Sequence, residues 1–177
     1  MEREPMLADS IRNLYGYDAW ATTKILTAAE GLTPEQLDAE GPIPHGTIRK
    51  TLLHLLIVHK RFLSWWDGSL PAQEAYALMA DPADYPDLAA VVAFRQQVAD
   101  QTQAFVDGLR DEDAAEYLST TGPGGMEFGF PRWQMMQHVV NHNTQHRSEV
   151  AVMLTQFGSS PGDIDLIFYQ LESAARA

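Results

Sequence analysis

Residues 138–146 read His138-Val139-Val140-Asn141-His142-Asn143-Thr144-Gln145-His146 and place three of the chain's six histidines at steps of four residues. Residues four apart lie one above the other on an α-helix, with Cβ atoms about 5–6 Å apart, so two successive imidazoles can reach one metal ion. His138 and His146 are separated by roughly 12 Å along a helix axis and cannot easily share that ion. One adjacent pair should therefore bind a metal, while the third histidine does something else.

The pattern of this helix selects the pair. With His142 set at zero and about 100° per residue, the residues within about 60° of it form the expected inward face. They are Met135, Val139, His146, Glu149 and Met153. Because this face contains both His142 and His146, these two are the expected ligands. Buried imidazoles need partners, and a metal ion is one good partner.

A third ligand has to come from another helix, and His54 is the best donor. It shares a helical face with Thr51, Val58, Phe62 and Trp65, which are expected to point inward. His59 is about 140° away on the same helix and is expected to face outward. His45 lies in the loop Pro44-His45-Gly46. On spacing alone, a metal site and a set of hydrogen-bonded core histidines remain equally open.

Four long segments carry the period of a helix, and they define the expected fold. They run over 5–29, 47–66, 87–109 and 131–157, with Asp87 as an N-cap and Gly158 as a C-terminal stop. A shorter C-terminal helix is expected over 164–175. This pattern predicts an all-α four-helix bundle that forms one domain over 1–177, with a topology that need not be simple up-and-down.

The connections between these helices differ in length. Thr33-Pro34-Glu35-Gln36 reads as a capping box and predicts a single helical turn. Residues 67–86 contain three prolines and form a long connection, with one short helix expected over 73–79. Two alternating runs, 116–120 and 126–130, flank a glycine-rich turn and predict a small hairpin.

Composition excludes several classes of protein. Twelve Lys and Arg against 24 Asp and Glu give a formal net charge of −12, which disfavours binding to nucleic acid or to an anionic membrane surface. No apolar run is long enough for a membrane span, and no secretory signal is visible. Cysteine is absent, which fits a cytoplasmic location and removes thiolates as nucleophiles or ligands.

Residues 135–147, Met135-Met136-Gln137-His138-Val139-Val140-Asn141-His142-Asn143-Thr144-Gln145-His146-Arg147, resemble the histidine signature of the DinB-like (DinB/YfiT) metalloprotein superfamily. Residues 47–54, 17–21 and 161–165 resemble that family's second helix, first helix and C-terminal segment. The resemblance covers nearly the whole chain. Many relatives have glycine after the position of Arg147, where this chain has Ser148 and Glu149.

The resemblance implies a four-helix bundle with a divalent metal, commonly zinc or nickel, on three histidines. Matched residue by residue, these ligands are His54, His142 and His146, and His138 is an additional histidine outside the set. Relatives include thiol-dependent S-transferases, such as those using bacillithiol, and mycothiol-dependent maleylpyruvate isomerases. The resemblance therefore implies a homodimer that acts on a small molecule with a low-molecular-weight thiol as cosubstrate.

Three neutral imidazoles would leave the metal's charge uncompensated and a coordination position open, as in catalytic sites. A water or a thiol bound there is a nucleophile at neutral pH. The expected function is thiol-dependent S-transfer to a small electrophile, with a metal-dependent hydrolase or a non-catalytic metal- or ligand-binding bundle as alternatives. Zinc is favoured, and nickel or iron also suits imidazole ligands.

Several polar and aromatic residues have a structural interpretation beside a functional one. Arg147 is expected in a helix-surface ion pair rather than on an anionic cosubstrate. Asn141, Asn143 and Glu149 are candidates for hydrogen bonding to the ligands. Tyr17 and Trp20 are expected to serve packing rather than substrate contact.

Overall fold

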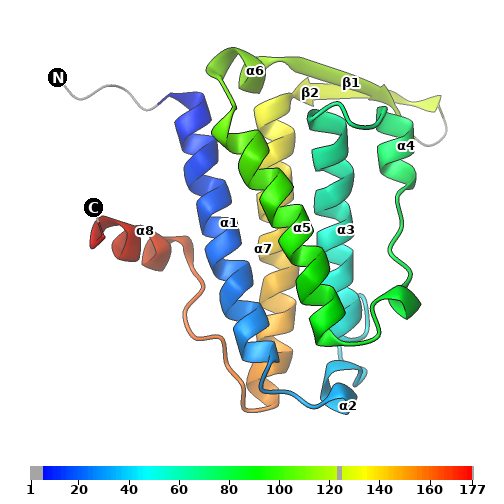
Figure 1. The fold of residues 1–177 in the computed structure, drawn as a ribbon, viewed down its shortest axis with the longest axis vertical. Helices are drawn as coiled ribbons and strands as arrows, with labels where there is room; N and C mark the ends of the chain where they lie inside the picture. The colour runs from blue at the N-terminus through cyan, green and yellow to red at the C-terminus, as the bar shows by residue number, and fades with distance from the viewer. Residues whose placement is uncertain (1–5, 123–124, 177) are drawn as a thin grey trace.

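The computed structural model describes residues 6–122 and 125–176. Its main body is a bundle of four long helices (Figure 1), α1 (Leu7–Ala29), α3 (Ile48–Trp66), α5 (Leu88–Asp107) and α7 (Arg132–Gln156). Helices α1 and α3 both pack against α7, and α5 closes the bundle against α3 and α1. The expected all-α four-helix bundle is confirmed.

The bundle is not a simple up-and-down arrangement. Helices α3 and α5 run in the same direction, opposite to α1 and α7 (Figure 1). Two parallel neighbours need a connection that travels back along the bundle, and residues 67–87 make it. This connection contains α4 (Ala72–Ala77) and the 3₁₀ turn η1 (Pro82–Asp84). Its length is therefore a consequence of the topology.

The helices begin where side chains can satisfy their first backbone N–H groups. Thr47 accepts a hydrogen bond from the Lys50 amide, and Asp87 accepts one from the Ala90 amide. The capping box expected at Thr33 is present and starts α2 (Pro34–Leu37), with Gln36 completing it. These caps explain why the expected helices agree with the observed ones to within two or three residues at most ends.

The remaining elements cover the ends and one side of the bundle. The expected hairpin consists of β1 (Tyr117–Thr121) and β2 (Glu127–Pro131), which pair antiparallel from Tyr117↔Pro131 to Thr121↔Glu127. A short helix that was not expected, α6 (Asp111–Ala115), precedes it. Helix α8 (Leu166–Ala174) lies outside the bundle beside α1 (Figure 1). Among the described residues, no helix has the length and apolarity to cross a membrane.

The hydrophobic core has two parts along the bundle. One part includes Ile11 of α1 and Val139 of α7, and the other includes Ile25 of α1 and Val150 of α7. Between these levels, α1, α3 and α7 bury polar side chains. They are Asp18, Thr22, His59, Asn143, His146 and Arg147. The middle of the bundle is thus a polar layer, and the candidate site belongs to it.

Candidate metal centre

Four histidines converge on one side of the polar layer. His54 comes from α3, His142 and His146 come from α7, and His45 comes from the loop that precedes α3. The ring centroid of His54 lies 5.1 Å from that of His142 and 4.8 Å from that of His146. The ring centroids of His142 and His146 are 4.5 Å apart. The three histidines expected from the sequence therefore lie together, with His45 as a fourth neighbour.

The spacing of the nitrogen atoms suits a shared metal ion. The Nε2 atoms of His54 and His142 are 3.2 Å apart. Two nitrogens that each lie about 2.0–2.1 Å from one tetrahedral zinc ion are roughly 3.3–3.4 Å apart. His45, His54 and His146 also offer ligand atoms that all lie within 4.8 Å of one another. The cluster thus contains two alternative sets of three, which differ in whether His142 or His45 is included.

The orientation of the rings differs between the two sets. A metal ion lies along the nitrogen lone pair and therefore close to the plane of each ligand ring. The rings of His45 and His54 are stacked, 3.7 Å apart with an interplanar angle of 24°, so their planes do not meet at a nearby point. The ring of His54 is inclined by 44° to that of His142 and by 80° to that of His146. The inclined rings of His54, His142 and His146 are compatible with a set that includes His142.

His146 is oriented by a carboxylate. Its Nδ1 lies 2.7 Å from Oε2 of Glu149, one turn further along α7, and its side chain is only 7% exposed. A carboxylate accepts hydrogen bonds, so Nδ1 carries the proton and the Nε2 lone pair is free for a metal. Glu149 therefore supplies the hydrogen bond that metal-binding histidines commonly make with their second nitrogen.

Three histidines of the cluster have lowered pKa values. Burial lowers the pKa of His54 and of His142 to about 4, and the neighbouring histidines lower both further in the same direction. Burial and His146 also lower the pKa of His45. Because only a neutral imidazole has a free lone pair, these pKa shifts keep the donors ready for a cation.

His45 is the neighbour that helical spacing could not place. Gly46 follows it with φ of +79°, in the left-handed region, and a Cβ there would collide with the Glu40 side chain. This turn bends the loop back over the start of α3, so that His45 stacks on His54. The only signal in the sequence is the His-Gly pair just before the Thr47 cap.

Arg147 has a different place from the one expected. It is 1% exposed, and its guanidinium pairs with the buried carboxylate of Asp18. It also donates to Thr22 at 3.2 Å and to Thr144 at 2.9 Å. The expected ion pair exists, but the expectation of a surface position was wrong because this face of α7 packs on α1 rather than facing solvent.

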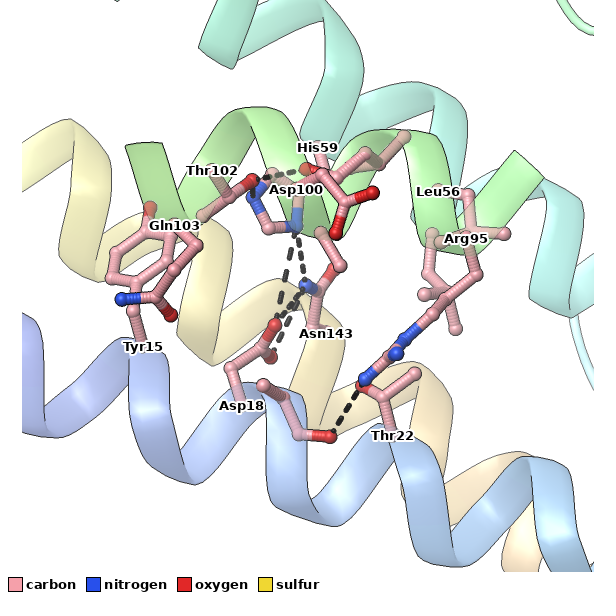
Figure 2. A pocket seen from close by; sticks show the side chains of 14 residues that line it. Tyr15, Asp18, Thr22, Leu56, His59, Arg95, Asp100, Thr102, Gln103 and Asn143 are labelled. Atoms are coloured by element: carbon pink, nitrogen blue, oxygen red, sulfur yellow. Dashed lines mark hydrogen bonds and ion pairs between the residues drawn. The ribbon is translucent and has the colours of Figure 1, made fainter. Parts of the chain in front are cut away.

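His59 is also buried rather than facing outward, because α5 covers that face of α3. A pocket of about 240 Å³ lies here. Figure 2 shows that His59, Asp18 and Asn143 meet in it between α1, α3 and α7. Thr102 donates its hydroxyl proton to the Val98 carbonyl, so it accepts the Nε2–H of His59 at 3.0 Å. The other nitrogen, Nδ1, then accepts from the Asn143 amide at 3.4 Å.

The other face of α3 is less buried than expected. Val58, Phe62 and Trp65, expected to point inward with His54, are only half-buried, whereas Thr51 is buried. The half-buried residues line an apolar pocket of about 450 Å³ between α3, α4, the hairpin and α7. Its walls include Phe62, Trp65, Tyr76, Phe128 and His138, and His142 lies at its edge. The histidine cluster therefore adjoins a cavity large enough for a small molecule.

The other residues considered from the sequence have structural contacts. Asn143 donates to both carboxylate oxygens of Asp18 at 3.2 Å, whereas Asn141 is exposed on α7. Tyr17 donates to the Ile164 carbonyl, and the indole N–H of Trp20 donates to Glu172 on α8. These contacts agree with packing roles for Tyr17 and Trp20. His138 packs against Phe62 with ring centroids 5.5 Å apart, and its ring centroid lies 6.0 Å from that of His142, so it borders the cluster from the pocket side.

A four-helix bundle with clustered histidines on its second and last long helices defines a class of small metal-binding proteins. Comparison with protein-family models identifies the DinB family over residues 6–175, nearly the whole chain. The chain therefore belongs to the DinB family. A search of curated proteins found no match.

Proposed function

We propose that this DinB-family protein is a divalent-metal-dependent enzyme that transfers a low-molecular-weight thiol to a small electrophile. The metal would be held by His54, His142 and His146. The observation that carries the proposal is the position of these imidazoles beside an apolar pocket, which His142 also lines. A purely structural metal site is usually closed by its ligands and needs no adjoining cavity.

The donor set indicates which chemistry the ion would supply. A divalent ion on three neutral imidazoles is a Lewis acid that lowers the pKa of a coordinated thiol or water. In thiol transfer, sulfur forms a bond to the electrophilic carbon, the thiol loses its proton, and a leaving group departs with the bonding electron pair. The chain contains no cysteine, so the thiol has to be a cosubstrate.

The protein's own residues would orient the reactants and exclude water. Glu149 fixes the ring of His146, and the stacked ring of His45 limits the rotation of His54. Phe62 and Trp65 cover the pocket side of α3 with aromatic surface. Aromatic surface beside the metal would favour attack by a bound thiol over attack by bulk water.

Zinc is the proposed native metal, since three imidazoles with an open position are typical of catalytic zinc. Imidazole also suits nickel and iron. Two alternative functions are compatible with the same site: a metal-dependent hydrolase and a non-catalytic metal-binding bundle. The apolar character of the pocket favours a substrate with an organic body, which argues for an enzyme acting on small molecules.

The test combines a panel of small thiols with a panel of electrophilic acceptors. Each pair is assayed with metal-loaded protein, with chelator-treated protein and with the His54→Ala variant. Thiol conjugation that disappears in the last two samples supports S-transfer. Ester or amide cleavage without thiol would instead identify a hydrolase. No turnover, together with a cobalt-substituted site whose spectrum thiols leave unchanged, would favour the non-catalytic bundle.

A further inference from the structure

Arg61 of α3 is a cation without a carboxylate partner among the residues that the structure describes. Its Nε donates to the Leu78 carbonyl at 2.6 Å, and Nη2 lies 2.8 Å from the Met79 sulfur. Its guanidinium carbon lies 5.5 Å from the centroid of the Tyr76 ring. These contacts fix the position of the guanidinium but leave its charge uncompensated.

Arg61 stands between the apolar pocket and the histidine cluster. It lines the pocket together with Phe62, and it also lines a second pocket of about 320 Å³ together with His45 and His54. A group bound to Arg61 would therefore lie next to the candidate metal ligands.

Four aromatic side chains also line the pocket, beside small and polar residues, and part of the aromatic surface remains open. Tyr76 on α4 is 63% exposed and Phe128 on β2 is 41% exposed, although both line the pocket. Phe62 and Trp65 form the α3 side. Exposed aromatic side chains around a cavity of about 450 Å³ are suited to cover the apolar body of a small ligand.

We propose that this pocket binds a small organic anion, with its aromatic or extended apolar body against Phe62, Trp65, Tyr76 and Phe128 and its anionic group on Arg61. This inference rests on the proposed function and names the class of its electrophilic substrate. Guanidinium groups bind carboxylates through charge-assisted hydrogen bonds, which are about twice as strong as neutral ones.

Because the protein has a negative net charge, an anion can be attracted only by a nearby cationic side chain. With a formal charge of −12, the protein as a whole repels anions at long range. That field is screened beyond about 8–10 Å at physiological ionic strength, whereas a direct contact with Arg61 is not. An anion would therefore bind through Arg61 itself, and binding should depend on this one side chain.

The experiment is calorimetric titration of the full-length protein with three probes: phenylbutyrate, phenylbutanol and butyrate. Each is titrated into metal-loaded and into chelator-treated protein, because a carboxylate could otherwise bind the metal. The variants are Arg61→Met, Arg61→Lys and Phe128→Ala. Arg95→Met is the matched control, since Arg95 is half-buried and donates to Ala19 and Thr23 outside this pocket.

The expected result is that phenylbutyrate binds about tenfold or more tightly than either other probe, with and without metal. Arg61→Met should remove the advantage over phenylbutanol, Arg61→Lys should keep part of it, and Arg95→Met should leave it unchanged. Phe128→Ala should weaken phenylbutyrate and phenylbutanol by the same factor. Equal affinity of the wild type for the acid and the alcohol, or a preference that survives Arg61→Met, would overturn the proposal.

The same samples separate this inference from the proposed function. If the wild-type protein binds metal and turns over thiol but does not prefer the acid, the proposed anion site is wrong and the proposed function stands. If the protein prefers the acid but binds no metal, the proposed function is wrong and the anion-binding pocket stands.

Discussion

Nδ1 of His146 lies 2.7 Å from Oε2 of Glu149, which lies one turn further along α7. This contact assigns the protonated nitrogen of His146 and leaves the other nitrogen available. If His146 is a metal ligand, the carboxylate should strengthen the bond by orienting the ring and increasing its basicity. The first prediction follows from this relationship.

Glu149→Ala should weaken metal binding by about 10–100-fold, the usual effect of removing such a partner. Glu149→Gln should weaken it less, because the amide oxygen can still accept the Nδ1–H of His146. Competition with a coloured chelator measures both affinities. Glu30→Ala, at an exposed glutamate beyond the end of α1, is the control. Unchanged affinity in Glu149→Ala would show that this hydrogen bond does not support a metal ligand.

Asp18→Ala should destabilise the fold by about 3–5 kcal/mol, because it leaves the guanidinium of Arg147 buried without its counter-charge. Asn143 would lose its acceptor at the same time. Urea denaturation of chelator-treated protein measures the loss. Arg110→Ala, which breaks an exposed ion pair with Asp113, should leave the midpoint unchanged.

Arg147→Met and the double variant Asp18→Ala/Arg147→Met complete a double-mutant cycle for this ion pair. The two single losses should not add, since each leaves the same pair broken. Additive losses would mean that Asp18 and Arg147 act independently and would contradict the buried pair.

The stability of the metal-free protein should fall as the pH drops from about 6.5 towards 4. In the folded protein, the pKa values of His54 and His142 lie near 4, below the ordinary value of 6.5. In this pH range the unfolded chain binds protons that the folded chain excludes, so acid favours unfolding, whereas above pH 6.5 the contribution is constant.

Thermal melts across this range should show a steeper loss for the wild type than for the His54→Gln/His142→Gln variant, which lacks both shifted groups. Parallel curves for the two proteins would contradict the low pKa values of these histidines.

We also predict a homodimer in solution. Ile167 and Leu171 on α8 are 56% and 60% exposed, and Val152 on α7 is 55% exposed. These exposed apolar side chains on α8 and α7 would be covered by a second copy related by a two-fold axis. Light scattering at micromolar concentration should give twice the mass of one chain, and the mass of a single chain would refute the prediction.

The sequence was informative wherever a local rule acts. Helical period, caps and the glycine-rich turn predicted the four long helices, the short turn at Thr33 and the hairpin. The spacing of His142 and His146, together with His54 on another helix, brought out three residues that do lie together. All of these signals depend on neighbours within a few positions.

The errors concern contacts between distant segments. Whether His59 faces solvent depends on where α5 packs, and whether Arg147 is buried depends on how α1 approaches α7. Neither can be worked out from the period of one helix. Helical period also says nothing of His45, because the turn at Gly46, not a regular element, brings it back to His54.

The metal content of a set of single variants, purified without a nickel column, tests the central claim most directly. Elemental analysis should find about one equivalent per chain in the wild type, in His138→Ala and in His45→Ala. His54→Ala, His142→Ala and His146→Ala should each lose most of it, with circular dichroism confirming that the variants are folded. Full metal content in His142→Ala, with loss in His45→Ala or His138→Ala, would contradict the assignment of His54, His142 and His146 as the ligands.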